Sequence, residues 1–188
     1  MLHDELIAEF HDTQSFKWDP KGGFKLASGL LSPFYVDCRT LMAFPRARHV
    51  VAQLAWEVIR DFQLDCIGGL ELGAISIATS ISDHAYRAKP QRNWRTFVVR
   101  KHAKDHGLGR LLEGVVMKGD RALIVDDVLT SGGSVVKAIT AAREAGLEVK
   151  EALVIVDRKE QDGRARVEQM GVRVISLLTI DHLMKGRS

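Results

Sequence analysis

From residue 45 onward, the sequence alternates helical patterns with short apolar runs, and this alternation constrains the fold more than any other feature. Pro45 opens a segment with one apolar helical face, formed by Val50, Val51, Leu54, Ala55, Val58, Ile59 and Phe62. Apolar runs occupy residues 64–70, 96–100, 122–127, 151–158 and 172–178, and further helices are expected at 74–88, at 133–145 and between the last two runs. Strands that alternate with helices predict right-handed βαβ units around a parallel sheet, an α/β fold.

The composition of the apolar runs and the flanking segments supports this interpretation. Continuous runs such as ALIV and ALVIV suit strands that are buried on both faces. Gly146 follows the helix at 133–145 and is expected to end it. Near the N-terminus, residues 2–12 have helical spacing, whereas Gly, Ser and Pro divide residues 22–39 into short extended pieces, with FYVD the best strand candidate. Residues 101–114 are polar and basic with little periodicity, so no regular element is expected there.

Composition limits the class of protein. The chain has 188 residues, of which 46% are hydrophobic, so one domain with one buried core is expected. A net charge of +3 does not argue for a nucleic-acid partner. Cys38 and Cys66 lack a CxxC or metal-like spacing and are expected to be buried thiols in a reducing cytoplasm. The sequence has no apolar run long enough to span a bilayer and no signal-peptide pattern, so no membrane association is expected.

Three unusual segments follow predicted strands, and ligands of open α/β sheets bind beyond the carboxyl ends of the strands. The segments are GLELG at 69–73, RKHAKDHG at 100–107 and DDVLTSGGS at 126–134. We therefore expect all three to converge on one site.

The third segment combines a phosphate cradle with two acids. Thr130–Ser134 lies between a strand and a helix, where free backbone N–H groups, glycines and hydroxyls suit a phosphate. Neither the GK[ST] ending of a Walker A loop nor a dinucleotide GxGxxG is present. Asp126 and Asp127 would repel that phosphate, but they suit the hydroxyls of an attached sugar and a sugar ring that becomes cationic. The alternative is an ordinary βα turn in which one of the two acids acts as a cap.

The string VDDVLTSGGS resembles the phosphoribosyl-pyrophosphate (PRPP) motif of the type I phosphoribosyltransferases. RKxxKDHG resembles the mobile catalytic loop of the orotate phosphoribosyltransferases, and residues 24–37 and 156–163 resemble two further segments of that family. The resemblance implies a central parallel sheet flanked by helices, with a small N-terminal hood. The hood would comprise about residues 1–40 plus a C-terminal segment, within a single phosphoribosyltransferase domain of residues 1–188.

The same resemblance implies an activity. The chain would transfer the phosphoribosyl group of PRPP to orotate, giving orotidine 5′-monophosphate and pyrophosphate, a step of pyrimidine (UMP) biosynthesis. The transfer would require Mg²⁺ held mainly by PRPP, near Asp126 and Asp127, with no certain protein ligand. The implied assembly is a cytoplasmic homodimer whose loop closes over the neighbouring subunit's active site.

The resemblance also assigns residues. The implied catalytic residues are Lys104, His106, Asp126 and Asp127, and the implied orotate contacts are Lys25, Thr130 and Arg158. The implied PRPP contacts are Arg100, Lys101, Lys104, His106, Asp126, Asp127, Val128, Leu129, Thr130, Ser131, Gly132, Gly133 and Ser134.

The chain departs from the family pattern at three positions. Ala27, Leu30 and Gly73 replace cations that many members carry, and Glu71 is an unexpected neighbour for pyrophosphate. In an extended segment, Lys25 projects on the same face as position 27, so we expect it to replace the missing lysine in part. The alternatives are a phosphoribosyltransferase for another base, a non-catalytic PRPP-binding regulator and a generic nucleotide-binding domain. The KDHG loop and Arg158 argue against another base. A regulator would need a nucleic-acid-binding module, for which the chain has no spare length. The missing GxGxxG and GK[ST] motifs argue against a generic nucleotide-binding domain.

Overall fold

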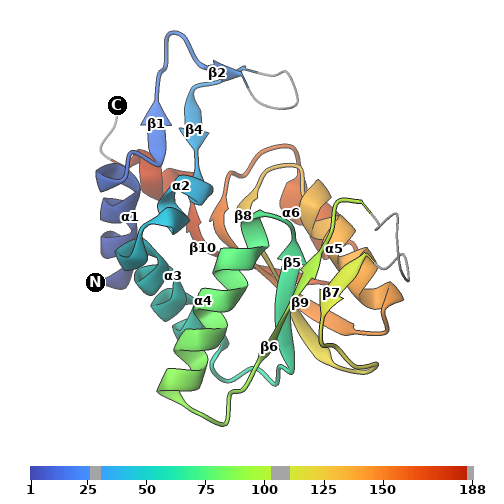
Figure 1. Cartoon of the computed structure of the whole chain (residues 1–188). Coiled ribbons are helices and arrows are strands. Elements are labelled where there is room, and N and C mark those ends of the chain that lie inside the picture. Colours follow the sequence, from blue (N-terminus) through green and yellow to red (C-terminus); the bar gives the residue numbers. More distant parts are fainter. Residues whose placement is uncertain (26–30, 103–110, 186–188) are drawn as a thin grey trace.

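The computed structural model describes residues 1–25, 31–102 and 111–185, and Figure 1 shows a central sheet between two layers of helices. Its helices are α1 (Leu2–Asp12), α2 (Cys38–Ala43), α3 (Pro45–Ile59), α4 (Gly73–Ala88), α5 (Gly133–Glu144), α6 (Gly163–Glu168) and α7 (Ile180–Met184). Its strands are β1 (Phe16–Trp18), β2 (Phe24–Lys25), β3 (Leu31–Ser32), β4 (Phe34–Val36), β5 (Cys66–Leu70), β6 (Arg95–Val99), β7 (Leu112–Gly114), β8 (Arg121–Leu129), β9 (Glu148–Asp157) and β10 (Arg173–Thr179).

The main sheet confirms the predicted parallel architecture. Its strand order is β10-β9-β8-β5-β6-β7, and every pairing is parallel except that of β7 with β6. β7 is a correction, because residues 101–114 were expected to form no regular element. Its three residues are too few to show periodicity, and only the ladder to Phe97–Val99 makes them a strand.

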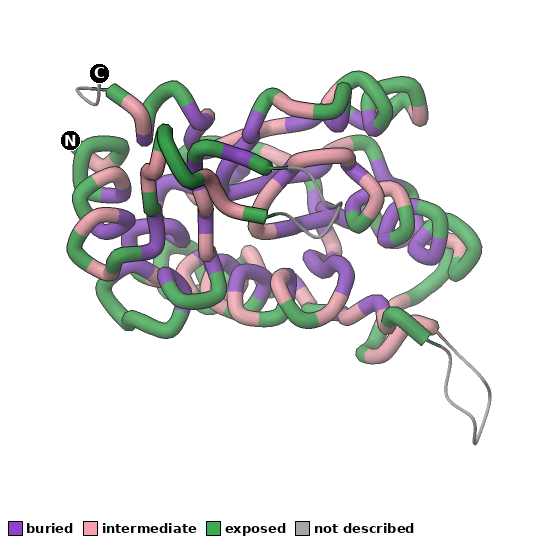
Figure 2. Tube along the Cα trace, turned by 90° about the horizontal axis from the view of Figure 1, so that it is seen from above, coloured by how far each residue is buried: buried purple, intermediate pink, exposed green. Residues whose placement is uncertain are grey.

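Side chains of β8 alternate between two hydrophobic layers, which explains why its sequence is continuously apolar. Leu123 and Val125 belong to a core cluster with α1, α3 and α4, whereas Ala122 and Ile124 belong to a second cluster with α5 and α6. Successive side chains of a strand point to opposite faces, so a strand covered on both sides needs apolar residues at every position. Figure 2 shows buried residues along the centre of the molecule, where the main sheet lies between the helices.

The helix boundaries follow the sequence signals with one exception. Pro45 is at the first position of α3, as predicted, but the helix ends at Ile59. Phe62 therefore lies beyond the helix, and Val58 is 42% exposed because Ile59, which is fully buried, fills the core position instead. Gly146 ends α5 as predicted: it has φ 88°, its N–H bonds to the Arg143 carbonyl, and the Leu147 N–H bonds to the Ala142 carbonyl.

The N-terminal elements extend the same core. β1 pairs with β4 and β2 with β3 in two short antiparallel ladders, which project beyond the sheet in Figure 1. The predicted FYVD strand is β4, but its aspartate, Asp37, instead caps α2, a helix that the sequence did not indicate. Phe10 and Phe16 share one hydrophobic cluster with Ile77 of α4. The N-terminal segment and the sheet are therefore packed together.

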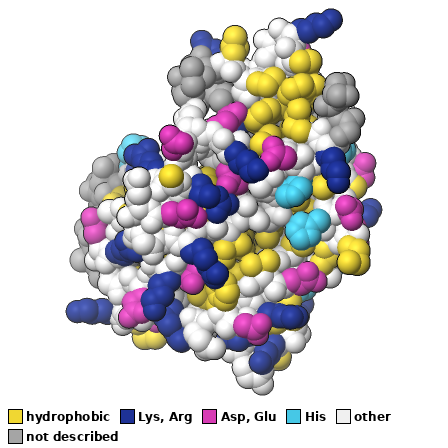
Figure 3. Space-filling view, turned by 180° about the vertical axis from the view of Figure 1, so that it is seen from behind, with side chains coloured by type: hydrophobic (Ala, Val, Ile, Leu, Met, Phe, Trp, Pro, Cys, Tyr) yellow, Lys and Arg dark blue, Asp and Glu magenta, His cyan; other side chains and the backbone are white. Residues whose placement is uncertain are grey.

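The molecular surface matches the mild net charge. Figure 3 shows lysines and arginines interspersed with acids over the back of the molecule, with hydrophobic side chains gathered at the projecting end and again near the middle of this face. In the part of the chain that the structure describes, none of the helices combines the length and apolarity required to cross a bilayer.

Candidate active site

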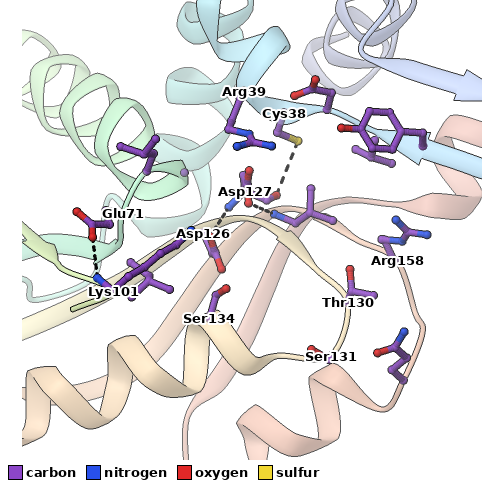
Figure 4. Close-up of a pocket in the computed structure, with 18 of the residues that line it drawn as sticks. Cys38, Arg39, Glu71, Lys101, Asp126, Asp127, Thr130, Ser131, Ser134 and Arg158 are labelled. Carbon is purple, nitrogen blue, oxygen red and sulfur yellow. Dashed lines mark hydrogen bonds between the residues drawn. The ribbon is translucent and has the colours of Figure 1, made fainter. Parts of the chain in front are cut away.

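A cavity of about 620 Å³ opens at the carboxyl ends of β5, β6, β8 and β9, and Figure 4 shows its lining. The three segments singled out in the sequence all contribute to it, so their predicted convergence is confirmed. The lining residues are Lys25, Tyr35, Val36, Asp37, Cys38, Arg39, Leu70, Glu71, Leu72, Gly73, Lys101, Asp126, Asp127, Val128, Thr130, Ser131, Ser134, Arg158 and Gln161. A smaller hollow of about 200 Å³ adjoins it around Asp126 and residues 128–135, which include Leu129, Gly132 and Gly133.

The two aspartates lie within β8 rather than at its tip, which corrects the sequence prediction. Val128 and Leu129 continue the ladder opposite Val156 and Asp157 of β9. Because neighbouring strand residues point to opposite faces, the two carboxylates are presented on different sides of the strand. Asp126 is 6% exposed, whereas Asp127 is half-buried.

Local backbone contacts hold both carboxylates. The Asp127 N–H donates to Asp126 Oδ1 at 3.0 Å, and the Val128 N–H donates to Asp127 Oδ1 at 2.8 Å. Burial, followed by the negative charge of Asp127, raises the pKa of Asp126 to about 8. Asp127 packs against the start of α4, where a Cβ added to Gly73 would lie 3.0 Å from Asp127 Cγ. Glycine at position 73 therefore leaves room for this carboxylate.

The Thr130–Ser134 loop leads into α5 through Gly132, which has φ 73°. The Thr130–Ser134 loop makes close backbone contact with the loop after β9. A Cβ added to Gly163 would lie 2.1 Å from the Thr130 carbonyl oxygen, so position 163 has no room for a side chain. Free N–H groups at the start of α5 and the hydroxyls of Ser131 and Ser134 form a cradle suited to an anion.

Arg158 follows β9 and is the most firmly held cation of the cavity. Only 5% of the residue is exposed, and its guanidinium stacks on Phe34, with Cζ 4.6 Å from the ring centroid. Nε donates to Glu160 Oε2 at 3.0 Å, and Nη2 donates to Ser32 Oγ at 2.9 Å. The guanidinium therefore has a fixed orientation at the cavity wall.

Glu71, unexplained in the sequence, connects two loops. Its Oε1 accepts a hydrogen bond of 2.7 Å from the Lys101 N–H, which joins the loop after β5 to the segment after β6. The Glu71–Leu72 peptide bond is cis. Arg100 is not part of the cavity lining: its Nε donates to the His102 carbonyl, and Nη1 lies 3.8 Å from Glu113.

The structure therefore brings together Lys25, Lys101, Thr130 and Arg158 with the aspartate pair. Lys104, His106, Ala27 and Leu30 lie outside the described residues. The sequence prediction missed a group of lining residues at the end of β4 and the start of α2, namely Tyr35, Asp37, Cys38 and Arg39, together with Gln161. The position of Cys38 and Arg39 directly after the predicted FYVD strand was the available signal.

Cys38 is buried behind the aspartates. Its Sγ donates to the Asp127 carbonyl at 3.9 Å, and burial together with nearby acids raises the pKa of the thiol. Cys66 is also buried, and both cysteines are free thiols, as predicted. Within the described residues, no group of three or more His, Cys, Asp or Glu side chains could hold a metal ion. The aspartate pair offers hard oxygen ligands of the kind that Mg²⁺ prefers.

Comparisons with known proteins agree with this geometry. The family model for the phosphoribosyl transferase domain matches residues 37–176. The chain is 37% identical over 185 residues to an orotate phosphoribosyltransferase of Aquifex aeolicus, covering 98% of this chain and 99% of that protein. It is also 37% identical over 187 residues to an orotate phosphoribosyltransferase of Pyrococcus horikoshii, covering 98% and 95% of the two chains. A crystal structure of Mycobacterium tuberculosis orotate phosphoribosyltransferase in complex with PRPP has a TM-score of 0.77 at 30% identity, covering 97% and 99%.

The raised pKa of Asp126 predicts how stability depends on pH in the absence of ligands. Between the ordinary value of 3.8 and about 8, the folded state retains a proton that the unfolded state has lost, so the free energy of unfolding falls as pH rises. Asp126→Asn removes this pH-dependent decrease, because asparagine does not titrate. The free energy of unfolding of the variant, relative to that of the unchanged protein, should therefore increase through that interval, by at most about 1.4 kcal/mol per pH unit.

Urea unfolding from pH 4 to pH 9 measures the effect. Asp61→Asn is the matched control and should show no growing advantage, because Asp61 is exposed and its one ion pair among the described residues is the 3.8 Å contact with Arg60. An advantage of Asp126→Asn that is constant with pH would contradict the assignment.

Proposed function

We propose that this chain, which belongs to the phosphoribosyl transferase family and within it to the orotate phosphoribosyltransferases, transfers the phosphoribosyl group of PRPP to orotate. The products are orotidine 5′-monophosphate and pyrophosphate, a step of pyrimidine synthesis. The observation that carries this function is one cavity that combines an aspartate pair, a Thr/Ser/Gly loop and a fixed arginine at neighbouring strand ends.

Each part of the cavity matches one part of the substrates. The Thr130–Ser134 loop would hold the 5′-phosphate through backbone N–H groups and hydroxyls. Asp126 and Asp127 would accept hydrogen bonds from the ribose hydroxyls. Arg158 would bind orotate, since a guanidinium held flat by Phe34 and Glu160 can form parallel hydrogen bonds with a planar carboxylated ring.

The chemistry is a substitution at the first carbon of the ribose. A bond forms between that carbon and a ring nitrogen of orotate, and this nitrogen gives up its proton. The bond to the pyrophosphate oxygen breaks, and pyrophosphate leaves with the bonding electrons and takes up a proton. The sugar ring becomes cationic in the transition state. The carboxylate of Asp127, joined by that of Asp126 once Asp126 loses its proton, favours that charge. The chain therefore acts by positioning and electrostatics and requires no side-chain nucleophile.

Magnesium dependence is part of the proposal. A bound Mg²⁺ would neutralise charge on the leaving pyrophosphate. Asp126 and Asp127 are the residues that fit it, and they form too small a set to hold it alone. This supports a cation carried mainly by PRPP.

The direct test is turnover. The protein mixed with PRPP, Mg²⁺ and orotate should consume orotate, measured as a loss of its ultraviolet absorbance, and EDTA should stop the reaction. Adenine, guanine and hypoxanthine serve as control bases and should not react. Turnover of a purine without any reaction of orotate would overturn the proposal.

Arg158→Lys tests the orotate contact. A lysine keeps the positive charge but loses the planar fork, so the KM for orotate should rise about 10-fold or more, while the KM for PRPP changes little. Arg173→Lys is a matched control, because Arg173 also stacks on a phenylalanine, Phe62, and faces Glu151, but is exposed. An equal rise in both KM values for Arg158→Lys would show that it does not act on orotate in particular.

We also propose a homodimer with shared active sites. Support comes from the resemblance of the segment containing Lys104 and His106 to a loop that serves the neighbouring subunit. A Lys104→Ala protein and an Asp127→Asn protein should each be nearly inactive, and mixed dimers of the two should regain part of the activity in the orotate assay. A mixture that forms heterodimers without regaining activity would rule out sharing.

We place the protein in the cytoplasm. The two free, buried cysteines support a reducing compartment. In a cell fractionation, the protein should be recovered in the same fraction as cytoplasmic marker proteins. Recovery with exported proteins would contradict this placement.

A further inference from the structure

Arg39 is a cation of the cavity that neither the sequence motifs nor the proposed roles account for. It lines the cavity from the start of α2, and Figure 4 shows its side chain pointing into the space beside Asp127. Among the described residues it forms neither an ion pair nor a side-chain hydrogen bond. Asp37, Asp126 and Asp127 line the same cavity, yet none of them lies within ion-pair distance of the guanidinium. Its charge is therefore available to a ligand.

The neighbours of Arg39 fix its position relative to β8. On one side, Asp37 caps α2, because its carboxylate accepts hydrogen bonds from the Thr40 N–H at 3.1 Å and the Thr40 hydroxyl at 3.0 Å. On the other side, Cys38 is buried, with Sγ 3.9 Å from the Asp127 carbonyl. The backbone of Arg39 is therefore anchored, while its side chain remains exposed toward the cavity.

The location of Arg39 in the cavity indicates which part of the substrate it would contact. In Figure 4, Arg39 lies across Asp127 from Thr130 and Ser131, and α4 is the neighbouring helix on that side. The 5′-phosphate would occupy the Thr130–Ser134 side, and orotate would lie against Arg158. The group between Asp127 and the Glu71–Gly73 loop is then the pyrophosphate of PRPP.

This part of the cavity needs additional positive charge. Pyrophosphate carries several negative charges, and it would lie near Asp127 and Glu71. The described cations that line this side are Lys101 and Arg39. Gly73 cannot take a side chain without crowding Asp127, so α4 offers backbone groups only. A guanidinium opposite that backbone can form two parallel hydrogen bonds with phosphate oxygens.

We infer that Arg39 is a pyrophosphate-binding residue that neutralises the leaving group during transfer. The inference rests on the proposed function, because it assumes that PRPP occupies this cavity. It adds a contact from the N-terminal part of the chain to those made by the loops after the strands.

The test separates pyrophosphate from the rest of the substrate. Arg39→Gln should weaken the binding of pyrophosphate with Mg²⁺ about 10- to 100-fold, measured by titration calorimetry. Orotidine 5′-monophosphate carries the base, the ribose and the 5′-phosphate but no pyrophosphate, so its Kd should stay within about twofold. Arg39→Lys keeps the charge without the fork and should have an intermediate effect on pyrophosphate.

Arg60→Gln is the matched control, since Arg60 is an exposed arginine outside the cavity. Within the described part of the chain, its side chain forms a single ion pair, of 3.8 Å with Asp61. Unfolding temperatures of the variants establish that they remain folded. Unchanged pyrophosphate binding in Arg39→Gln overturns the inference. Equal losses for pyrophosphate and orotidine 5′-monophosphate also overturn it, because Arg39 would then act on the aspartates or the ribose. Failure of the unchanged protein to consume orotate would instead overturn the proposed function.

Discussion

The parallel contact between β5 and β8 determines where the charged groups of the cavity lie. The two strands approach so closely that a Cβ added to Gly69 would lie 2.1 Å from the Val125 carbonyl oxygen. This approach brings the loop after β5 next to the aspartates of β8 and sets Gly73 against Asp127. The helices on both faces bury β8, so its main-chain bonds to β5 and β9 are protected from water. The carboxylates are thus presented by a strand that is paired on both edges and covered on both faces.

The cavity places acids and cations together without pairing most of them inside the protein. Asp126 and Asp127 accept hydrogen bonds from backbone N–H groups, and Glu71 accepts one from the Lys101 N–H. Arg39 likewise remains without an ion-pair partner among the described residues, whereas Arg158 is held by Glu160 and Ser32. Because backbone groups hold the acids, the side-chain charges remain available to a ligand that carries both phosphates and hydroxyls. An internal salt-bridge network would have cancelled them.

The sequence predicted the parallel strands of the main sheet and their helices well, because buried parallel strands and amphipathic helices leave strong periodic signals. It also predicted the convergence of three loops, since the carboxyl ends of parallel strands meet at one edge. It missed β1, β7, α2 and α7, whose few residues carry no period. The sequence pattern could not predict that β8 continues past Asp127, because the extra residues become part of the strand only by pairing with β9. Arg39 was missed because its contribution depends on how α2 packs against β8, a contact between residues far apart in the chain.

The close contact between Gly163 and Thr130 affects how such a protein can change its choice of base. The loop after β9, which begins with Arg158, and the loop after β8, which is proposed to hold the 5′-phosphate, meet backbone to backbone with no side chain between them. A substitution that shifts the first loop to admit another base would also move the second. New base specificity is therefore easier to reach by replacing side chains on an unchanged backbone than by inserting or deleting residues there. Under the proposed assignment of the two loops, phosphate binding thus restricts the paths by which base recognition can evolve.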